Sequence, residues 1–262
     1  MKRLLHFTLF IALCSTNVDA SQRFLLRNIT QTSSLLTNSG SLKFLLPPHA
    51  QPSSRNYFKK TMINSNQETE TDPLSLRKEI YNLFDDISPY DEIEKAHKKT
   101  ILEWINSSNE IFRIQKPNIP PQHLVAYFVL LDEADKSLLL VDHKNAQLWL
   151  TAGGHVEINE HPKITVEREC EEELNTKADF WNSLPVFLTV TPTVGLTSGH
   201  TDVGIWYVLK GKIDQEYKFD NSEFTDIKWF KFKDIPYAKA DPNMERFVEK
   251  LKFLLERRKN EK

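Results

Sequence analysis

Three glutamates lie within five residues of one another, at a spacing that could bind a metal ion. Glu169, Glu172 and Glu173 stand at positions i, i+3 and i+4, so a helix would project all three carboxylates from one face. Like charges within one turn weaken an ordinary helix, whereas a hard cation such as Mg²⁺ prefers oxygen ligands and commonly bridges carboxylates to phosphates. The spacing alone is also typical of a solvated helix surface, so a metal site needs further support.

The segment that carries these glutamates has the start and stop signals of a helix. Pro162 suits a first turn and Asn175 can adopt the left-handed conformation that ends a helix, which predicts a helix from Pro162 to Leu174. Val166 and Cys170 form an apolar stripe on this helix, because a buried cysteine acts as a small hydrophobic residue. We expect the stripe to hold the helix against a sheet while the glutamates face a cleft.

A longer pattern surrounds the three glutamates. It reads G-x5-E-x7-R-E-U-x-E-E-x-G-U, where U is apolar, and its charged and glycine positions are filled by Gly154, Glu160, Arg168, Glu169, Glu172 and Glu173. In these residues the chain resembles the Nudix hydrolases, over a region from about Gln122 to Leu255. Asn175 replaces the last glycine of the signature and Thr176 its last apolar residue, so neither departure affects a charged position.

The resemblance implies a metal-binding role for the acidic face of this helix. Glu169, Glu172 and Glu173 would hold one or more Mg²⁺ or Mn²⁺ ions, together with the carbonyl oxygen of Gly154. Such ions neutralise the negative oxygens that protect a pyrophosphate, and they lower the pKa of a bound water.

Other residues would orient the acids or move a proton. The resemblance implies that Arg168 orients the carboxylates by charge-assisted hydrogen bonds, with Glu160 in a structural role. A carboxylate that is not fully used by metal can act as the general base, and both Glu169 and the loop residue Glu223 are candidates. Weaker candidates for the base are Glu216 and Asp220.

Apolar runs on both sides of the motif predict the fold class. Strands are expected near residues 124–131, 137–141, 147–150, 186–190, 203–209 and 227–232, and a last amphipathic helix near residues 243–256. Strands mixed with helices in one piece indicate an α/β domain, which we place at residues 117–258. The resemblance implies a Nudix-type α/β/α sandwich with a mixed sheet. Two further amphipathic patterns, with apolar residues at helical spacing, predict a short helical extension over residues 73–116.

The N-terminal residues have the composition of an addressing segment. Residues 1–20 combine Lys2 and Arg3, a short apolar run and a small-residue cleavage pattern, which predicts a signal peptide and an extracytoplasmic protein. Residues 21–72 are expected to be a disordered linker. Their acid-poor, Ser- and Arg-containing start is equally typical of an organellar transit peptide, and translation from Met62 would instead leave a cytoplasmic protein.

Composition limits the partners. A hydrophobic fraction of 40% can build a sizeable core, and a net charge of −2 gives no electrostatic case for a nucleic-acid polymer. No stretch approaches the roughly 20 apolar residues of a transmembrane helix. We expect a small-molecule nucleotide as the partner, and a homodimer stays open.

A few polar residues outside the motif have two interpretations. His155 and His161 flank it and could be metal ligands or bases. We interpret them as surface or capping residues, because oxygen ligands suffice for Mg²⁺. His200 and Asp202 precede a predicted strand, where they would either contact substrate or belong to a simple loop. Pro192 lies where Nudix enzymes acting on ADP-ribose often carry a proline, although a proline that ends a strand explains it equally.

Two functions follow from this pattern. The first is a Mg²⁺-dependent enzyme that cleaves the pyrophosphate bond of a nucleoside diphosphate linked to another group, such as ADP-ribose, or of a nucleoside triphosphate. The second is a non-catalytic nucleotide-binding or sensor module on the same fold. Degenerate Nudix domains usually lose acids of the motif and this chain keeps all of them, which favours the enzyme.

Overall fold

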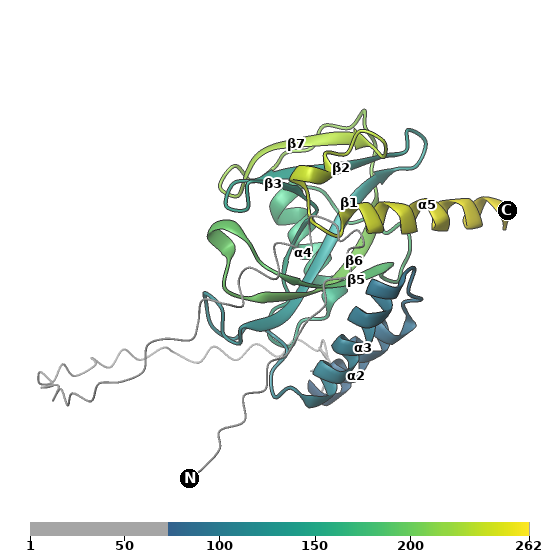
Figure 1. The fold of residues 1–262 in the computed structure, drawn as a ribbon. Coiled ribbons are helices and arrows are strands. Elements are labelled where there is room, and N and C mark those ends of the chain that lie inside the picture. The colour runs from purple at the N-terminus through teal and green to yellow at the C-terminus, as the bar shows by residue number, and fades with distance from the viewer. Residues whose placement is uncertain (1–72, 262) are drawn as a thin grey trace, which may run out of the picture. The chain divides into compact units, whose positions relative to one another are not determined.

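The computed structural model describes residues 73–261 (Figure 1). The predicted signal peptide, the predicted linker and the alternative start at Met62 lie outside these residues. The elements, in chain order, are α2 (Pro73–Asp86), α3 (Glu92–Ser107), β1 (Gln122–Asp132), β2 (Ser137–His143), β3 (Leu148–Leu150), β4 (Ala152–His155), α4 (Pro162–Leu174), β5 (Phe187–Pro192), η1 (Gly195–Thr197), β6 (Thr201–Lys210), β7 (Phe224–Lys231), η2 (Tyr237–Lys239) and α5 (Met244–Asn260).

The strands form one seven-stranded mixed sheet with β1 at its centre. β3, β2, β1, β6 and β5 follow one another in the sheet, while β4 pairs with β1 and β7 pairs with β2. β1 and β6 are parallel along their whole length, and the other pairs are antiparallel. The second edge of β1 is divided, because residues 125–128 pair with β4 and residues 130–132 pair with β2.

Alternation along β1 builds a core on each face of this sheet. Leu124, Ala126 and Phe128 belong to a core that also contains Val166 and Cys170 of α4. The residues between them point the other way, since side chains alternate along a strand. Val129 and Leu131 therefore share the second core with residues of α5. Helices cover both faces, which is the expected α/β/α arrangement (Figure 1).

The helical extension is part of this compact body. The core that α4 covers also contains buried residues of α2 and α3, among them Ile80, Phe84, Ile101 and Ile105. α3 is also tied to α5, because Lys250 Nζ lies 2.6 Å from Glu94 Oε1 and both side chains are buried. Nε and Nη2 of Arg246 donate to the two carboxylate oxygens of Asp91, each at 2.7 Å.

The helix that carries the three glutamates was predicted correctly, from Pro162 to Leu174. Asn175 follows it in the left-handed conformation, with φ 47° and ψ 42°. The predicted strands are confirmed, with ends that differ by a few residues. The sequence did not predict β4, because a short segment with two glycines carries no strand signal; its pairing with β1 creates the strand.

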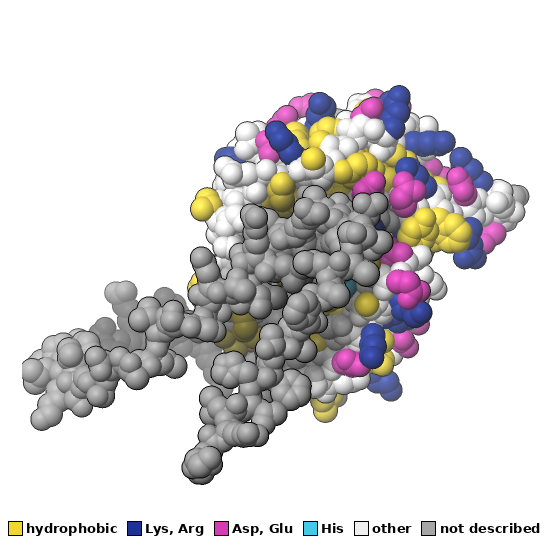
Figure 2. All heavy atoms as spheres, viewed as in Figure 1, with side chains coloured by type: hydrophobic (Ala, Val, Ile, Leu, Met, Phe, Trp, Pro, Cys, Tyr) yellow, Lys and Arg dark blue, Asp and Glu magenta, His cyan; other side chains and the backbone are white. Residues whose placement is uncertain are grey.

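The described residues contain no helix that is long and apolar enough to cross a membrane. On the face drawn in Figure 2, basic and acidic side chains of the described residues lie interspersed. Glu92 with Lys95 and Glu249 with Lys252 are examples of such exposed pairs. Pairs of this kind contribute little to stability, so the buried cores dominate the folding energy.

The packing of α2 and α3 predicts different outcomes for two shortened chains. A chain that begins at Met62 keeps both helices and should unfold at nearly the same temperature as the full chain. One that begins at Gln122 loses several buried side chains worth about 1.5–3 kcal/mol each, against a total stability of about 5–15 kcal/mol. It should aggregate or unfold, as gel filtration and thermal melts would measure. A Gln122 chain as stable as the full protein would contradict the shared core.

Candidate active site

The glutamate helix meets the Gly-Gly strand at Gly154. A Cβ atom added to Gly154 would lie 2.0 Å from Oε1 of Glu169, so the carboxylate occupies the space that any other residue would fill. α4 lies on this face of the sheet because Val166 and Cys170 are fully buried beneath it. A larger residue at this position of the motif would therefore displace the Glu169 carboxylate from its observed place.

Glu173 is the most buried of the three glutamates. Its residue is 5% exposed, and its Oε2 accepts a hydrogen bond from the backbone N–H of Gly153 at 2.8 Å. Burial, together with the nearby charge of Glu169, raises the pKa of Glu173 well above its usual value. Burial also raises the pKa of Glu169, although Arg168 opposes the shift.

Arg168 joins the acids of the motif in one network. Its Nε and Nη2 donate to the two carboxylate oxygens of Glu160, both at 3.0 Å. Its Nη1 donates to Glu169 at 2.7 Å and to Glu172 at 3.3 Å. Glu160 also accepts from the Thr165 hydroxyl at 2.7 Å. Although burial opposes the shift, these bonds hold the pKa of Glu160 below its usual value, so it remains charged opposite Arg168.

The remaining predicted acids lie at the rim. The Glu172 side chain is 60% exposed, on the same face of α4 as Glu169. Glu223 is exposed on the turn before β7, and its charge contributes to the raised pKa values of Glu169 and Glu173. Asp220 reaches α4 through its backbone, whose N–H donates to the Glu173 carbonyl at 2.9 Å. Glu216 is exposed in the same connection between β6 and β7.

Two histidines beside the motif have different roles in the structure. His161 caps α4, because its Nδ1 accepts the N–H of Lys163 at 3.1 Å, which confirms the capping interpretation. The surface interpretation of His155 is wrong. Its ring lies beside those of His123 and His200, with centroids 4.7 and 5.7 Å away, and burial lowers its pKa to about 3.

The two residues predicted to contact substrate belong to that same cluster. Nε2 of His200 lies 3.1 Å from Oδ1 of Asp202, and both side chains are nearly buried. The sequence did not single out His123, because only the parallel register of β1 and β6, which places it opposite Asp202, brings it there. Arg113, also missed, donates to Nε2 of His155 at 3.2 Å.

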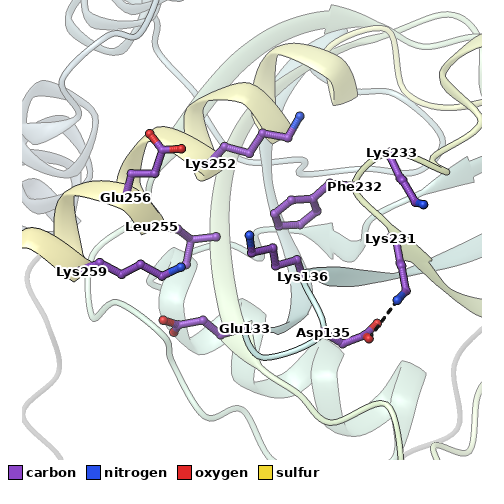
Figure 3. Close-up of a pocket in the computed structure, with 10 residues that line it drawn as sticks. All are labelled: Glu133, Asp135, Lys136, Lys231, Phe232, Lys233, Lys252, Leu255, Glu256 and Lys259. Carbon is purple, nitrogen blue, oxygen red and sulfur yellow. Dashed lines mark ion pairs between the residues drawn. The ribbon is translucent and has the colours of Figure 1, made fainter.

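A separate pocket lies at the end of α5, away from the motif (Figure 3). It has a volume of about 360 Å³ and is lined by five lysines around Phe232 and Leu255, with Glu133, Asp135 and Glu256 among them. Lys231 pairs with Asp135 at 3.3 Å. No residue of the glutamate motif lines it, so it does not belong to the site described above.

The donors around Gly154 fit a hard divalent cation. Glu169 is half-buried and its neighbour Glu173 is buried, and the raised pKa values of both carboxyls indicate that the surroundings do not fully compensate a negative charge. Arg168 pairs with Glu169 and Glu172, while the hydrogen bond of Glu173 comes from a neutral N–H. Carboxylate oxygens beside a backbone carbonyl are the ligands that Mg²⁺ and Mn²⁺ prefer.

One family of known proteins matches this chain. The model of the NUDIX domain matches residues 121–251, which is half of the chain. A NUDIX family hydrolase from Clostridium perfringens is 22% identical, covers 50% of this chain and 97% of its own, and has a TM-score of 0.41. MutT NUDIX hydrolase from Burkholderia pseudomallei is 21% identical, covers 49% and 97%, and has a TM-score of 0.39.

The E. coli ORF135 protein, at 20% identity, covers 51% of this chain and 90% of its own, with a TM-score of 0.40. Comparison with curated protein sequences finds no match. These structural likenesses carry no information on substrate. The family assignment rests on the match over residues 121–251 and on the complete motif from Gly154 to Glu173. This chain belongs to the Nudix family.

Proposed function

We propose that this chain is a Mg²⁺- or Mn²⁺-dependent pyrophosphohydrolase. Its substrate class would be a nucleoside diphosphate linked to another group, such as ADP-ribose, or a nucleoside triphosphate. The observation that carries the proposal is the meeting of Glu169 and Glu173 at the Gly153–Gly154 backbone, with Glu172 exposed beside them. Pyrophosphate hydrolysis needs concentrated positive charge at the phosphates, and such an acidic centre supplies it by binding cations.

The residues of the site would have different roles in this reaction. A bound divalent ion would neutralise phosphate oxygens and lower the pKa of the attacking water. Glu169 is suited to accept the proton, because burial raises its pKa towards neutral pH while Arg168 fixes its position. Glu223 remains a second candidate for the base, since its exposed position lets it approach a substrate that covers the site.

The choice of substrate within this class rests on one weaker observation. Pro192 is the last residue of β5, where it is exposed and pairs with Thr201 of β6. A proline at this distance from the motif supports ADP-ribose-like substrates, and its place at a strand end also has a simple structural reason. Substrate preference therefore has to be measured.

A non-catalytic nucleotide sensor is the alternative. Such a module would not need the close approach of a carboxylate to Gly154 or the buried Glu173. Burial of the Glu173 carboxyl costs folding energy, and both features are useful to a site that concentrates negative charge for cations. The intact motif favours the enzyme.

The proposal is tested by a phosphate-release screen of the full chain over nucleoside diphosphate derivatives and nucleoside triphosphates. Each compound is assayed with Mg²⁺, with Mn²⁺ and with a chelator. We expect turnover of at least one compound that stops when the chelator is added. Binding of a nucleotide without turnover under any metal condition would support the sensor instead.

Replacement of Glu172 or Glu173 by Gln should remove about 3–5 kcal/mol of transition-state stabilisation, a fall in kcat/KM of about 10²–10⁴-fold. The cause is lost negative charge at the metal, since Gln keeps the volume of each side chain. Glu171→Gln is the matched control, because Glu171 is exposed on the same helix but lies outside the motif. Near-normal turnover in both motif variants, with the control also normal, would contradict the metal assignment.

Gly154→Ala tests the contact between the strand and the helix. The added Cβ would lie 2.0 Å from Oε1 of Glu169, so the carboxylate must move and kcat should fall at least about tenfold. Asn175→Gly is the control, because a glycine adopts the left-handed φ of 47° without strain and activity should be unaltered. Steady-state kinetics at several Mg²⁺ concentrations would show the difference. Unaltered activity in Gly154→Ala would mean that Glu169 does not need its observed position.

A further inference from the structure

His123 has a free nitrogen atom in the protein interior. The residue is 0% exposed, and its Nδ1 lies 2.7 Å from the carbonyl oxygen of Pro120, to which it must donate a proton. Nε2 is buried and has no hydrogen-bond partner. Burial lowers the pKa of His123, so the ring is neutral and Nε2 presents a lone pair. A histidine that donates one N–H to a backbone carbonyl while its other nitrogen is free has the form of a metal ligand.

The proton positions on His200 follow from its neighbour Thr193. The Thr193 hydroxyl donates to the carbonyl oxygen of His200 at 3.0 Å, so its single proton is already used. Nδ1 of His200 lies 3.2 Å from that hydroxyl oxygen, and with the hydroxyl proton so placed we assign it as the donor. Nε2 of a neutral His200 is then a lone pair, and it lies 3.1 Å from Oδ1 of Asp202. Two electron-rich atoms at this distance require a positive charge between them, either a proton or a metal ion.

Asp202 is built to present that oxygen. It is 8% exposed, and its Oδ2 accepts the hydroxyl of Tyr127 at 2.6 Å, while its buried Oδ1 faces Nε2 of His200 at 3.1 Å. Although burial opposes the shift, contacts with His200 and Tyr127 hold its pKa below the usual value, so the carboxylate is charged. The pKa of Asp241, a half-buried carboxyl, is raised by burial and by the nearby charge of Asp202.

Strand pairing explains why these residues meet. The parallel register of β1 and β6 places His123 opposite Asp202, and the antiparallel register of β1 and β4 places His155 opposite Val125. Residues opposite one another share a face, and residues two apart along β1 do so as well. One ligand atom from each of His123, His155, His200 and Asp202 lies within 4.8 Å of the others.

This face differs from the face that carries the glutamate motif. Gly154 pairs with Ala126, whose side chain belongs to the core that α4 covers. His155 pairs with Val125, the residue before Ala126. Consecutive residues of a strand point to opposite faces, so the histidines and the glutamates lie on opposite sides of β1 and β4. The cluster is therefore a separate set of donors and not an extension of the Glu169 site.

We propose that His123, His155, His200 and Asp202 form a second metal site, for a divalent transition-metal ion of the Zn²⁺ type. Three imidazoles and one carboxylate are a donor set that suits Zn²⁺ and its neighbours, whereas Mg²⁺ prefers oxygen ligands. Zn²⁺ bonds of about 2.0–2.1 Å place tetrahedral ligands about 3.4 Å apart, close to the separation of His200 and Asp202.

The neighbouring charges limit how the ion is held. Arg113 donates to Nε2 of His155, so ligation through that nitrogen would displace the guanidinium, which is only partly buried. His123, His200 and Asp202 need no such exchange. The ion would also brace the motif, because His155 follows Gly154 directly and its carbonyl oxygen accepts from Nη2 of Arg168 at 3.4 Å.

Metal retention tests the proposal independently of hydrolysis. The full chain is stripped with a chelator, mixed with one equivalent of Zn²⁺ in a large excess of Mg²⁺, and desalted before elemental analysis. The excess of Mg²⁺ occupies oxygen sites, so retained Zn²⁺ reports a nitrogen-containing site. We expect about one Zn²⁺ per chain and a higher unfolding temperature than for the stripped protein. If the chain retains no more Zn²⁺ than a reference protein without a metal site retains after the same treatment, the proposal is overturned.

Variants locate the ion. His123→Asn and Asp202→Asn should each lower Zn²⁺ affinity at least about tenfold, a change at the lower end of what loss of a supporting group causes. His143→Asn is the control for loss of a histidine, and Glu172→Gln is the control for the glutamate motif. Both should retain Zn²⁺ as the unaltered chain does. Loss of Zn²⁺ in Glu172→Gln to the same extent as in the cluster variants would place the ion at the motif and overturn the assignment.

A spectroscopic measurement covers the case in which a cluster variant does not fold. X-ray absorption at the zinc edge of the unaltered, zinc-loaded chain should show the multiple scattering of imidazole rings. A shell of oxygen atoms alone would overturn the proposal. Because neither retention nor this spectrum depends on turnover, failure here would leave the proposed hydrolase intact, and failure of the substrate screen would leave the zinc site intact.

Discussion

The site depends on one close approach, that of the Glu169 carboxylate to the backbone of Gly154. The fold holds both partners of this contact, the helix α4 and the strand β4, in place. α4 is fixed by Val166 and Cys170 in the core beneath it, and β4 is fixed by its pairing with residues 125–128 of β1. Because β1 divides its second edge between β4 and β2, β4 pairs with β1 in the same sheet as β2. The carboxylate then fills the volume that a side chain would need.

Placing several carboxylates in one partly buried space is costly, and the network around Arg168 limits that cost. The two parallel hydrogen bonds between Arg168 and Glu160 hold the guanidinium in one orientation, from which Nη1 reaches Glu169 and Glu172. Glu173 receives less compensation, a single backbone N–H, and burial raises its pKa the most clearly. The remaining deficit of positive charge is the physical reason that the site should attract cations.

Much of this site could be predicted from the sequence, because its signals are local. Helical periodicity and capping fixed α4 to the residue, and the left-handed Asn175 followed from the need to end the helix. β4 and the histidine cluster could not be predicted in this way. Both arise from pairing between segments far apart in the chain, such as His123 with Asp202, and the register of a parallel pair leaves no mark in either segment alone.

The same strand therefore organises two sets of donors with different chemistry. On one face of β1, Ala126 pairs with Gly154 and the surrounding oxygens suit a hard ion. On the other face, His123 and its neighbours offer nitrogen lone pairs that suit a softer one. Since His155 and Gly154 are adjacent in β4, an ion held by the histidines would restrict the backbone against which Glu169 packs. Occupancy of the second face would then stabilise the geometry of the first without any contact between an ion there and the substrate.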